Sequence, residues 1–219
     1  MEVAEGQVKR LYQPPCARYA PFMNERIIKS LCVFCGSSDG EKKIYRRAAN
    51  DLGTFMGNNA IDLVYGGGGR GIMGELAASA KQAGSNVIGV IPTHIYEMVK
   101  HIAHQEDELI IVEGMHQRKA TMYEKADAFV ALPGGIGTLE EVLEIFTWLQ
   151  LGYHQKPVGL LNVDNYFSLL LQFLHYMADQ GFIRAQMVNT LVVESDPQQL
   201  LRGLNTVSLA IPRKIDSRS

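Results

Sequence analysis

Cysteine is scarce in this chain, with three cysteines among 219 residues. Three cysteines cannot form the disulfide framework of a small secreted protein. Cys32 and Cys35 have the CxxC spacing of redox and metal motifs, but they lie in an apolar run typical of a buried strand, where this spacing puts the thiols on opposite faces. No second cysteine–histidine pair completes a zinc site. We therefore expect neither a disulfide nor a bound metal.

Long hydrophobic runs and an excess of charge of one sign are also missing. No apolar stretch approaches the roughly 20 residues that a membrane-spanning helix needs, and the N-terminus lacks the apolar core of a signal peptide. The formal net charge is −2, so the molecule as a whole is not marked as a nucleic-acid binder. We expect a cytoplasmic protein that binds neither membranes nor nucleic acid and holds any anion locally.

The length suits one α/β domain and is short for two. Residues 1–29 contain three prolines and show no clean periodicity, so we interpret them as an N-terminal extension with room for a short helix near residues 24–29. We assign residues 30–206 to a single domain and residues 207–219 to a C-terminal tail.

From Ser30 onward, short apolar runs alternate with helical patterns. The expected strands are 31–35, 62–65, 86–91, 108–112, 128–132, 157–161 and 190–193. The expected helices lie around 44–55 and at 72–82, 115–125, 138–150, 166–179 and 197–204. Most of the apolar runs are continuous, as in strands covered on both faces. This order predicts a doubly wound, Rossmann-like α/β fold with a parallel sheet of about seven strands, in which ligands bind beyond the carboxyl ends of the strands.

Two glycine-rich junctions follow the first two expected strands. At Gly36-Ser37-Ser38, a ligand contact and a plain turn with a serine N-cap explain the residues about equally well. The run from Gly66 to Gly69 and then Gly71 opens the next helix. Four consecutive glycines cost about 0.5–1 kcal/mol each relative to alanine in regular structure, which indicates backbone amides exposed to an anion. The spacing does not fit GxGxxG and no acidic residue ends the next strand, so we expect a mononucleotide phosphate or ribose rather than a dinucleotide.

A third glycine junction, Pro133 to Glu141, again joins a strand to a helix. The amides of Gly135 to Thr138 should point outward at the helix start, where the dipole favours an anion by roughly 0.3–1 kcal/mol. No lysine follows the last glycine, so this is not a Walker loop. Thr138 and Glu141 also fit a capping box. Glu141 therefore either caps the helix or projects into the cleft, and the spacing leaves both interpretations open.

Two cations, Arg118 and Lys119, fall in the first turns of the helix expected at 115–125. Cations are normally disfavoured at a helix N-terminus. Their position indicates an anionic partner, which is either a ligand phosphate or Glu141. The alternative is a pair of solvated surface charges.

At these residues the sequence resembles the LONELY GUY family of cytokinin-activating phosphoribohydrolases, which has often been labelled "lysine decarboxylase-like". The resemblance runs from about Leu31 to about Ser195. Its motifs are Gly67 to Gly74, Arg118-Lys119, Pro133 to Glu141 with the pattern PGGxGTxxE, Thr147 to Gly152, and Lys156 to Asn162. The resemblance implies a Rossmann-like fold and a homodimer or higher oligomer.

The resemblance also implies an activity and a site. The chain would hydrolyse the N-glycosidic bond of an N6-modified adenosine monophosphate, or of AMP itself, to free base and ribose 5-phosphate, without a metal or organic cofactor. Arg118 and Glu141 match the family's catalytic pair. The residues expected to bind the nucleotide are Ser37, Gly67, Gly68, Gly71, Met115, Lys119, Gly134, Gly135, Ile136, Gly137, Thr138, Leu139 and Glu140.

One stretch departs from the family's pattern, and other functions compete with the hydrolase. Family members often carry a glutamate soon after the third strand, whereas Lys100 or His101 aligns near that position here and Glu97 is the nearby carboxylate. A non-catalytic nucleotide carrier or sensor would need the glycines but not a paired arginine and glutamate. A decarboxylase would commonly need a Schiff-base lysine, and Lys119 lies in no obvious cofactor motif. A pure scaffold would need neither glycine run.

Overall fold

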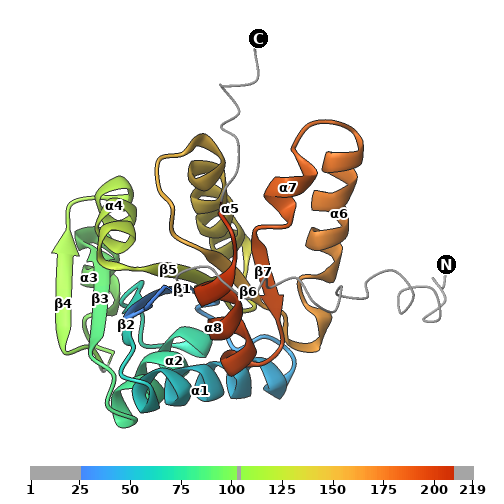
Figure 1. Ribbon diagram of the computed structural model, residues 1–219. Helices are drawn as coiled ribbons and strands as arrows, with labels where there is room; N and C mark the ends of the chain where they lie inside the picture. The colour runs from blue at the N-terminus through green and yellow to red at the C-terminus, as the bar shows by residue number, and fades with distance from the viewer. Residues whose placement is uncertain (1–25, 103–104, 210–219) are drawn as a thin grey trace, which may run out of the picture.

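The computed structural model describes residues 26–102 and 105–209. A seven-stranded parallel sheet forms its centre (Figure 1), with the strand order β4-β3-β2-β1-β5-β6-β7. The strands are β1 (Ser30–Phe34), β2 (Asp62–Tyr65), β3 (Val87–Pro92), β4 (Glu108–Val112), β5 (Ala128–Ala131), β6 (Val158–Leu161) and β7 (Leu191–Glu194). The expectation of a doubly wound α/β fold is confirmed.

Helices cover both faces of the sheet. Helices α1, α2 and α8 lie on one face, and α4, α5, α6 and α7 lie on the other (Figure 1). Their bounds are α1 (Lys43–Asn58), α2 (Gly71–Gln82), α3 (Thr93–Val99), α4 (Met115–Lys125), α5 (Ile136–Leu151), α6 (Ser168–Asp179), α7 (Ala185–Val188) and α8 (Pro197–Thr206), with a short 3-10 helix η2 at Val163–Asn165.

The central strands are apolar throughout because both of their faces are buried. Side chains alternate between two core clusters, so Leu31 and Val33 pack beneath α1 and α2, while Cys32 and Phe34 pack beneath α4 and α5. Cys35 falls in the first cluster and Cys32 in the second. The expectation that these two thiols lie on opposite faces is confirmed.

The strand order reverses between β1 and β5, and this reversal fixes where a ligand can bind. The chain leaves β1 toward α1 on one face and leaves β5 toward α5 on the other. Open α/β sheets bind ligands beyond the strand ends at such a reversal. The Gly36 and Gly134 junctions lie at this point of the sheet.

Most element bounds differ from the sequence expectation by one or two residues, and four differences concern the site or a whole helix. Helices α3 and α7 were not predicted, since α3 buries none of its residues and α7 is a single turn. Helix α6 begins two residues later than expected, because Asp164 and Asn165 adopt left-handed φ values of 52° and 59° in the preceding turn. Helix α5 begins two residues earlier than expected, at Ile136.

The described elements run from β1 to α8, and the assignment of residues 1–29 and 207–219 to terminal extensions lies largely outside the described residues. Residues 26–29 are not helical, so the short helix near residues 24–29 is wrong for that part. Within the described ranges, every helix is too short or too polar to span a bilayer.

Candidate functional site

The loops after β1 and β5 touch at the reversal of strand order. The Gly36 amide donates to the Pro133 carbonyl at 3.1 Å, and a Cβ on Gly36 would lie 3.3 Å from Gly134 Cα. Ser37 and Ser38 follow in exposed positions. Helix α1 begins only at Lys43 with Lys42 as its N-cap, so the serine N-cap interpretation of this junction is wrong.

The glycine run after β2 brings the second junction against the first and against α4. A Cβ on Gly71 would lie 2.5 Å from the carbonyl carbon of Ser37, and a Cβ on Gly66 would lie 2.2 Å from Nη2 of Arg118. Gly67 adopts a φ of +70° beside Ile91, and Gly68 lies against the Met73 thioether. Glycine is therefore required in this run because larger residues would clash with the neighbouring junction and with α4. Exposure of backbone amides to an anion is not the only reason for the glycines.

Gly71 allows a prediction about stability. Gly71→Ala should lower the free energy of unfolding by about 2–5 kcal/mol, because a left-handed φ costs roughly 1–2 kcal/mol for alanine and the clash with the backbone of Ser37 costs about 1–3 kcal/mol. Gly181 is a matched control, since its φ is +79° and its Cβ would meet nothing within 4 Å. Urea denaturation of both variants separates the two costs; equal losses would show that the close approach to Ser37 contributes nothing.

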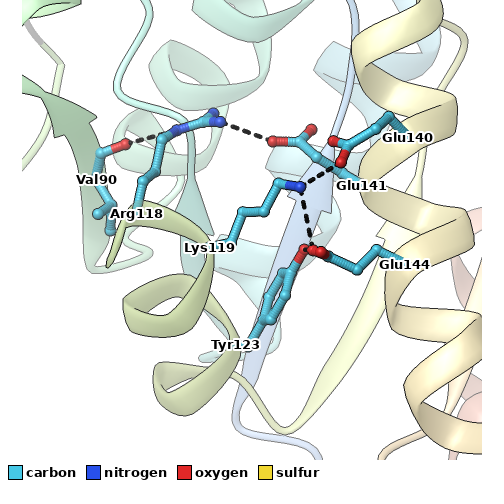
Figure 2. A network of polar contacts seen from close by, with 7 residues as sticks. All are labelled: Val90, Arg118, Lys119, Tyr123, Glu140, Glu141 and Glu144. Carbon is cyan, nitrogen blue, oxygen red and sulfur yellow. Dashed lines mark hydrogen bonds and ion pairs between the residues drawn. The ribbon is translucent and has the colours of Figure 1, made fainter. Parts of the chain in front are cut away.

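Arg118 and Glu141 form a buried ion pair between α4 and α5. Nη1 of Arg118 lies 2.8 Å from Oε1 of Glu141, and both side chains are about nine-tenths buried, at 10% and 11% exposure. Nε of Arg118 donates to the Val90 carbonyl at the end of β3 at 3.1 Å. Figure 2 shows the guanidinium lying between these two acceptors. The structure thus selects Glu141 as the anionic partner of Arg118 and excludes the solvated pair.

The capping-box interpretation of Glu141 is wrong. Helix α5 starts at Ile136 with Gly135 as its N-cap and has no side-chain cap. Thr138 is therefore the third helical residue, and its hydroxyl packs against Gly134, where a Cβ would lie 2.1 Å from Oγ1. The Glu141 carboxylate is directed across to Arg118 instead (Figure 2).

Lys119 belongs to a second polar cluster beside this pair. Its Nζ lies 3.2 Å from Oε2 of Glu144 and also pairs with Glu140. The Tyr123 hydroxyl donates to the same Glu144 carboxylate at 2.6 Å. Two cations of α4 thus face three carboxylates of α5 (Figure 2), which leaves the combined cluster with one excess negative charge.

Burial and pairing shift the pKa values of these groups. Burial raises the pKa of Glu141 above its ordinary value of 4.5, although Arg118 opposes the shift. Burial acts to lower the pKa of Lys119, but the carboxylates of Glu140 and Glu144 outweigh it, and the net shift is upward. Burial and the bond to Glu144 raise the pKa of Tyr123, so it stays a neutral donor.

The start of α5 is the open side of the site. A Cβ on Gly135 or Gly137 would meet no atom within 4 Å, and Ile136 between them is 85% exposed. The Tyr166 hydroxyl, from the segment after η2, donates to the Gly134 carbonyl at 2.5 Å. The hydrogen bond from Tyr166 therefore fixes the backbone of this loop at Gly134, while the positions of Gly135 and Gly137 stay accessible.

A cavity of about 590 Å³ opens beside the first two junctions. It is lined by Ser37, Ser38, Asp39, Arg46, Gly69, Arg70, Gly71, Gly74, Glu75 and Ala78. Arg118 and Glu141 are not part of its lining. We regard the cavity as an extension of the site, because Ser37 belongs to the loop that contacts Pro133 and Gly134.

The remaining sequence-predicted residues fall around this centre. Met115 is exposed at the first residue of α4, and Leu139 is partly buried against the core beneath α5. Glu97, near the departure from the family's pattern, pairs with Lys100 on α3. Among the described residues, no group of three or more His, Cys, Asp or Glu side chains is placed to hold a metal.

Sequence reasoning missed Tyr123, Glu144 and Tyr166. Helical spacing was a usable signal for two of them, since Glu144 lies four residues after Glu140 and Tyr123 lies four residues after Lys119, each on the same face of its helix. Tyr166 had no comparable signal. Its contact with Gly134 depends on the left-handed turn at Asp164 and Asn165.

Comparison with known proteins places these motifs in a wider group. The family model described as "Possible lysine decarboxylase" matches residues 73–204. A probable cytokinin riboside 5′-monophosphate phosphoribohydrolase of Oryza sativa subsp. japonica is 48% identical over 181 residues, covering 82% of this chain and 73% of the relative. A cytokinin riboside 5′-monophosphate phosphoribohydrolase of Arabidopsis thaliana is 49% identical over 177 residues, covering 80% and 81%.

Solved structures share the fold at lower identity. A molybdenum cofactor binding protein from Rippkaea orientalis matches with a TM-score of 0.60 at 24% identity, covering 79% of this chain and 93% of that chain. The molybdenum cofactor carrier protein of Chlamydomonas reinhardtii matches with a TM-score of 0.60 at 22% identity, covering 81% and 96%. At these identities the likeness extends to the fold alone.

Proposed function

Because the chain belongs to the LONELY GUY family of cytokinin riboside 5′-monophosphate phosphoribohydrolases, we propose that it hydrolyses the N-glycosidic bond of an adenine-type nucleoside 5′-monophosphate. The products are the free base and ribose 5-phosphate. The observation that carries this proposal is the buried pair of Arg118 and Glu141 beside three converging glycine junctions. No cofactor takes part in the proposed reaction.

Glu141 supplies the chemistry in this proposal. Breaking the bond between ribose and base builds positive charge on the sugar, as in glycoside hydrolysis. A carboxylate beside C1′ stabilises that charge and takes a proton from the attacking water, whose oxygen bonds to C1′ as the base leaves with the bonding electrons. The departed base then takes up a proton, and Glu141 releases the proton that it accepted, which restores the carboxylate. Arg118 holds the carboxylate in place and, through its remaining N–H groups, assists departure of the base.

The glycine junctions fix the rest of the nucleotide. The exposed start of α5, from Gly135 to Gly137, together with the half-buried Gly134 before it, offers backbone amides to the ribose phosphate portion. Ser37, Gly71, Met115, Lys119 and Glu140 line the surrounding surface in this proposal. Binding energy gained far from the breaking bond aligns C1′ with Glu141.

The decarboxylase description fits the site poorly. A Schiff-base lysine must lose its proton to attack a carbonyl, which requires a lowered pKa. Lys119 is held between Glu140 and Glu144, and the net shift of its pKa is upward. A carrier without catalysis has no use for the Arg118–Glu141 pair, because a buried ion pair carries a desolvation cost that simple anion binding does not require.

The direct test is base release. Purified protein is incubated with AMP, isopentenyladenosine monophosphate, GMP, CMP and the unphosphorylated nucleosides, and free base is measured by chromatography. We expect release from the adenine monophosphates and little from nucleosides that lack the phosphate. Tight nucleotide binding without base release would favour the carrier.

The raised pKa of Glu141 predicts the acid limb of the pH profile. The carboxylate must be ionised to stabilise the sugar cation, so kcat falls as the pH drops through this pKa. Because burial raises it above 4.5, the fall should occur at a higher pH than an ordinary glutamate would give. Measuring kcat at saturating AMP, with circular dichroism to exclude unfolding, checks this; full turnover at pH 4.5 would contradict it.

The proposal includes self-association and a cytoplasmic location. Helix α6 exposes Leu169, Phe173 and Tyr176 at spacings of four and three, which is one apolar face. Such a face suits a homodimer or higher oligomer, and sedimentation measures it directly. Buried free thiols at Cys32 and Cys35 are consistent with a reducing compartment.

A further inference from the structure

The cations of α4 are poorly suited to bind a phosphate. Arg118 is paired with Glu141, and Lys119 is paired with both Glu140 and Glu144. Three carboxylates face these two cations, so the cluster repels a dianion rather than attracting it. A cationic side chain that contacts the 5′-phosphate, in addition to the backbone amides at the start of α5, must therefore lie elsewhere in the site.

Arg70 is a cation of the site that is not neutralised in this way. It lies between Gly69 and Gly71, is exposed, and lines the 590 Å³ cavity together with Ser37 and Ser38. Within the described ranges, its guanidinium takes part in none of the ion pairs around the cavity, which all involve Arg46.

The two carboxylates of the cavity share one cation, Arg46. Nε of Arg46 lies 2.7 Å from Oε2 of Glu75, and Nη1 of Arg46 lies 3.6 Å from Oδ1 of Asp39. Nδ2 of Asn50 donates to the other oxygen of Glu75 at 2.8 Å. Arg46 and Arg70 together balance Asp39 and Glu75, and the Arg70 guanidinium, which forms an ion pair with neither carboxylate, keeps its N–H donors available to an incoming anion.

The position of Arg70 relative to the reacting centre is set by packing between loops. Its neighbour Gly71 contacts the backbone of Ser37, and the Ser37 loop contacts Pro133 and Gly134. A ligand that lies across Ser37 can therefore reach from the open start of α5 to the Arg70 side chain. A guanidinium also presents several N–H donors in the planar arrangement that suits phosphate oxygens.

We infer that Arg70 binds the 5′-phosphate of the nucleotide and is the residue that makes the enzyme prefer nucleoside monophosphates over nucleosides. This inference rests on the proposed function for the identity of the substrate. Arg70 is a binding residue in this assignment, and the bond-breaking step stays with Glu141.

Binding of ribose 5-phosphate tests the assignment without requiring turnover. Isothermal titration calorimetry compares wild type, Arg70→Ala, Arg70→Lys and Arg47→Ala. Arg47 is the matched control, because it is an exposed arginine of α1 that pairs only weakly, at 3.8 Å, with Asp51; it lines a neighbouring cavity and not the one that Ser37, Ser38 and Arg70 line. Arg70→Ala should weaken Kd by about tenfold or more, the loss expected for a hydrogen bond to a charged group. Arg70→Lys should lose less, and Arg47→Ala should stay within about twofold.

Kinetics supply the second readout. With AMP, Arg70→Ala should raise KM by about tenfold or more and change kcat by less than about threefold, while activity on adenosine stays at its wild-type level. The preference for AMP over adenosine should shrink by the same factor. Thermal unfolding of the exposed Arg70 variants should match wild type.

The outcomes separate this inference from the proposed reaction. A Kd for Arg70→Ala within twofold of wild type, or no measurable binding of ribose 5-phosphate to wild type, overturns the role of Arg70. Wild type that binds ribose 5-phosphate through Arg70 but releases no base from any nucleotide overturns the reaction and leaves the phosphate contact standing.

Discussion

Glu141→Gln should reduce kcat for base release by at least about two orders of magnitude. A positioned acid or base contributes about 10²–10⁴-fold, and glutamine keeps the size of the side chain while losing the negative charge that stabilises the sugar cation. KM should change little, because the nucleotide is held mainly by the junctions and not by this carboxylate. Steady-state assays with AMP measure both constants.

A matched variant shows whether the effect belongs to this carboxylate. Glu124 is exposed in the last turn of α4, away from the helix start, so Glu124→Gln removes the same charge without touching the site. It should retain full turnover. Near-normal kcat in Glu141→Gln would mean that the buried pair is structural, and the proposed mechanism would then fail.

Arg118→Ala should also lose at least about two orders of magnitude in kcat, for a different reason. The variant leaves Glu141 buried without its counter-ion and removes the group that fixes the orientation of the carboxylate through the Val90 carbonyl. Breaking one side of a buried pair typically costs about 3–5 kcal/mol of stability, so we expect a lower melting temperature as well. Base-release assays below that temperature, with circular dichroism as a control, isolate the catalytic loss.

The double variant distinguishes a catalytic unit from two independent contributions. If Arg118 acts by holding Glu141, Arg118→Ala combined with Glu141→Gln should be no slower than the slower single variant. Multiplying losses would show that Arg118 acts on the substrate separately. Arg118→Lys should recover only part of the activity, because an ammonium cannot contact Glu141 and Val90 together as the guanidinium does.

Continuous apolar runs made the sheet predictable, because a strand buried on both faces leaves a strong signal in sequence. The glycine junctions were equally visible, and their meeting point follows from the rule that ligands bind where strand order reverses. The sequence left two anionic partners open for Arg118, which were a ligand phosphate and Glu141. Only the structure decides between them, since the choice depends on how α4 and α5 pack.

Other parts of the site could not be predicted from the sequence, for physical reasons. The start of α5 at Ile136 depends on the extended conformation of Gly135, and glycine tolerates too many conformations for sequence to select this one. The capping-box motif was misleading because Thr138 fits that pattern yet is the third residue of the helix and not its N-cap. Tyr166 contacts Gly134 because a left-handed turn at Asp164 and Asn165 precedes it. The hydrophobic periodicity of the sequence does not indicate such a turn.

Two hydrogen bonds of the site limit how much of the chain must fold before the site exists. One joins Arg118 to the Val90 carbonyl, and the other joins Tyr166 to the Gly134 carbonyl. These bonds join positions 28 and 32 residues apart in the chain, and they involve the ends of β3 and β5 together with the segment after β6. The constellation cannot assemble in a fragment that lacks either half of the sheet. Because Arg118 follows β4 and Glu141 follows β5, their pairing requires strands on both sides of β1, and a chain that lacks either half should release no base.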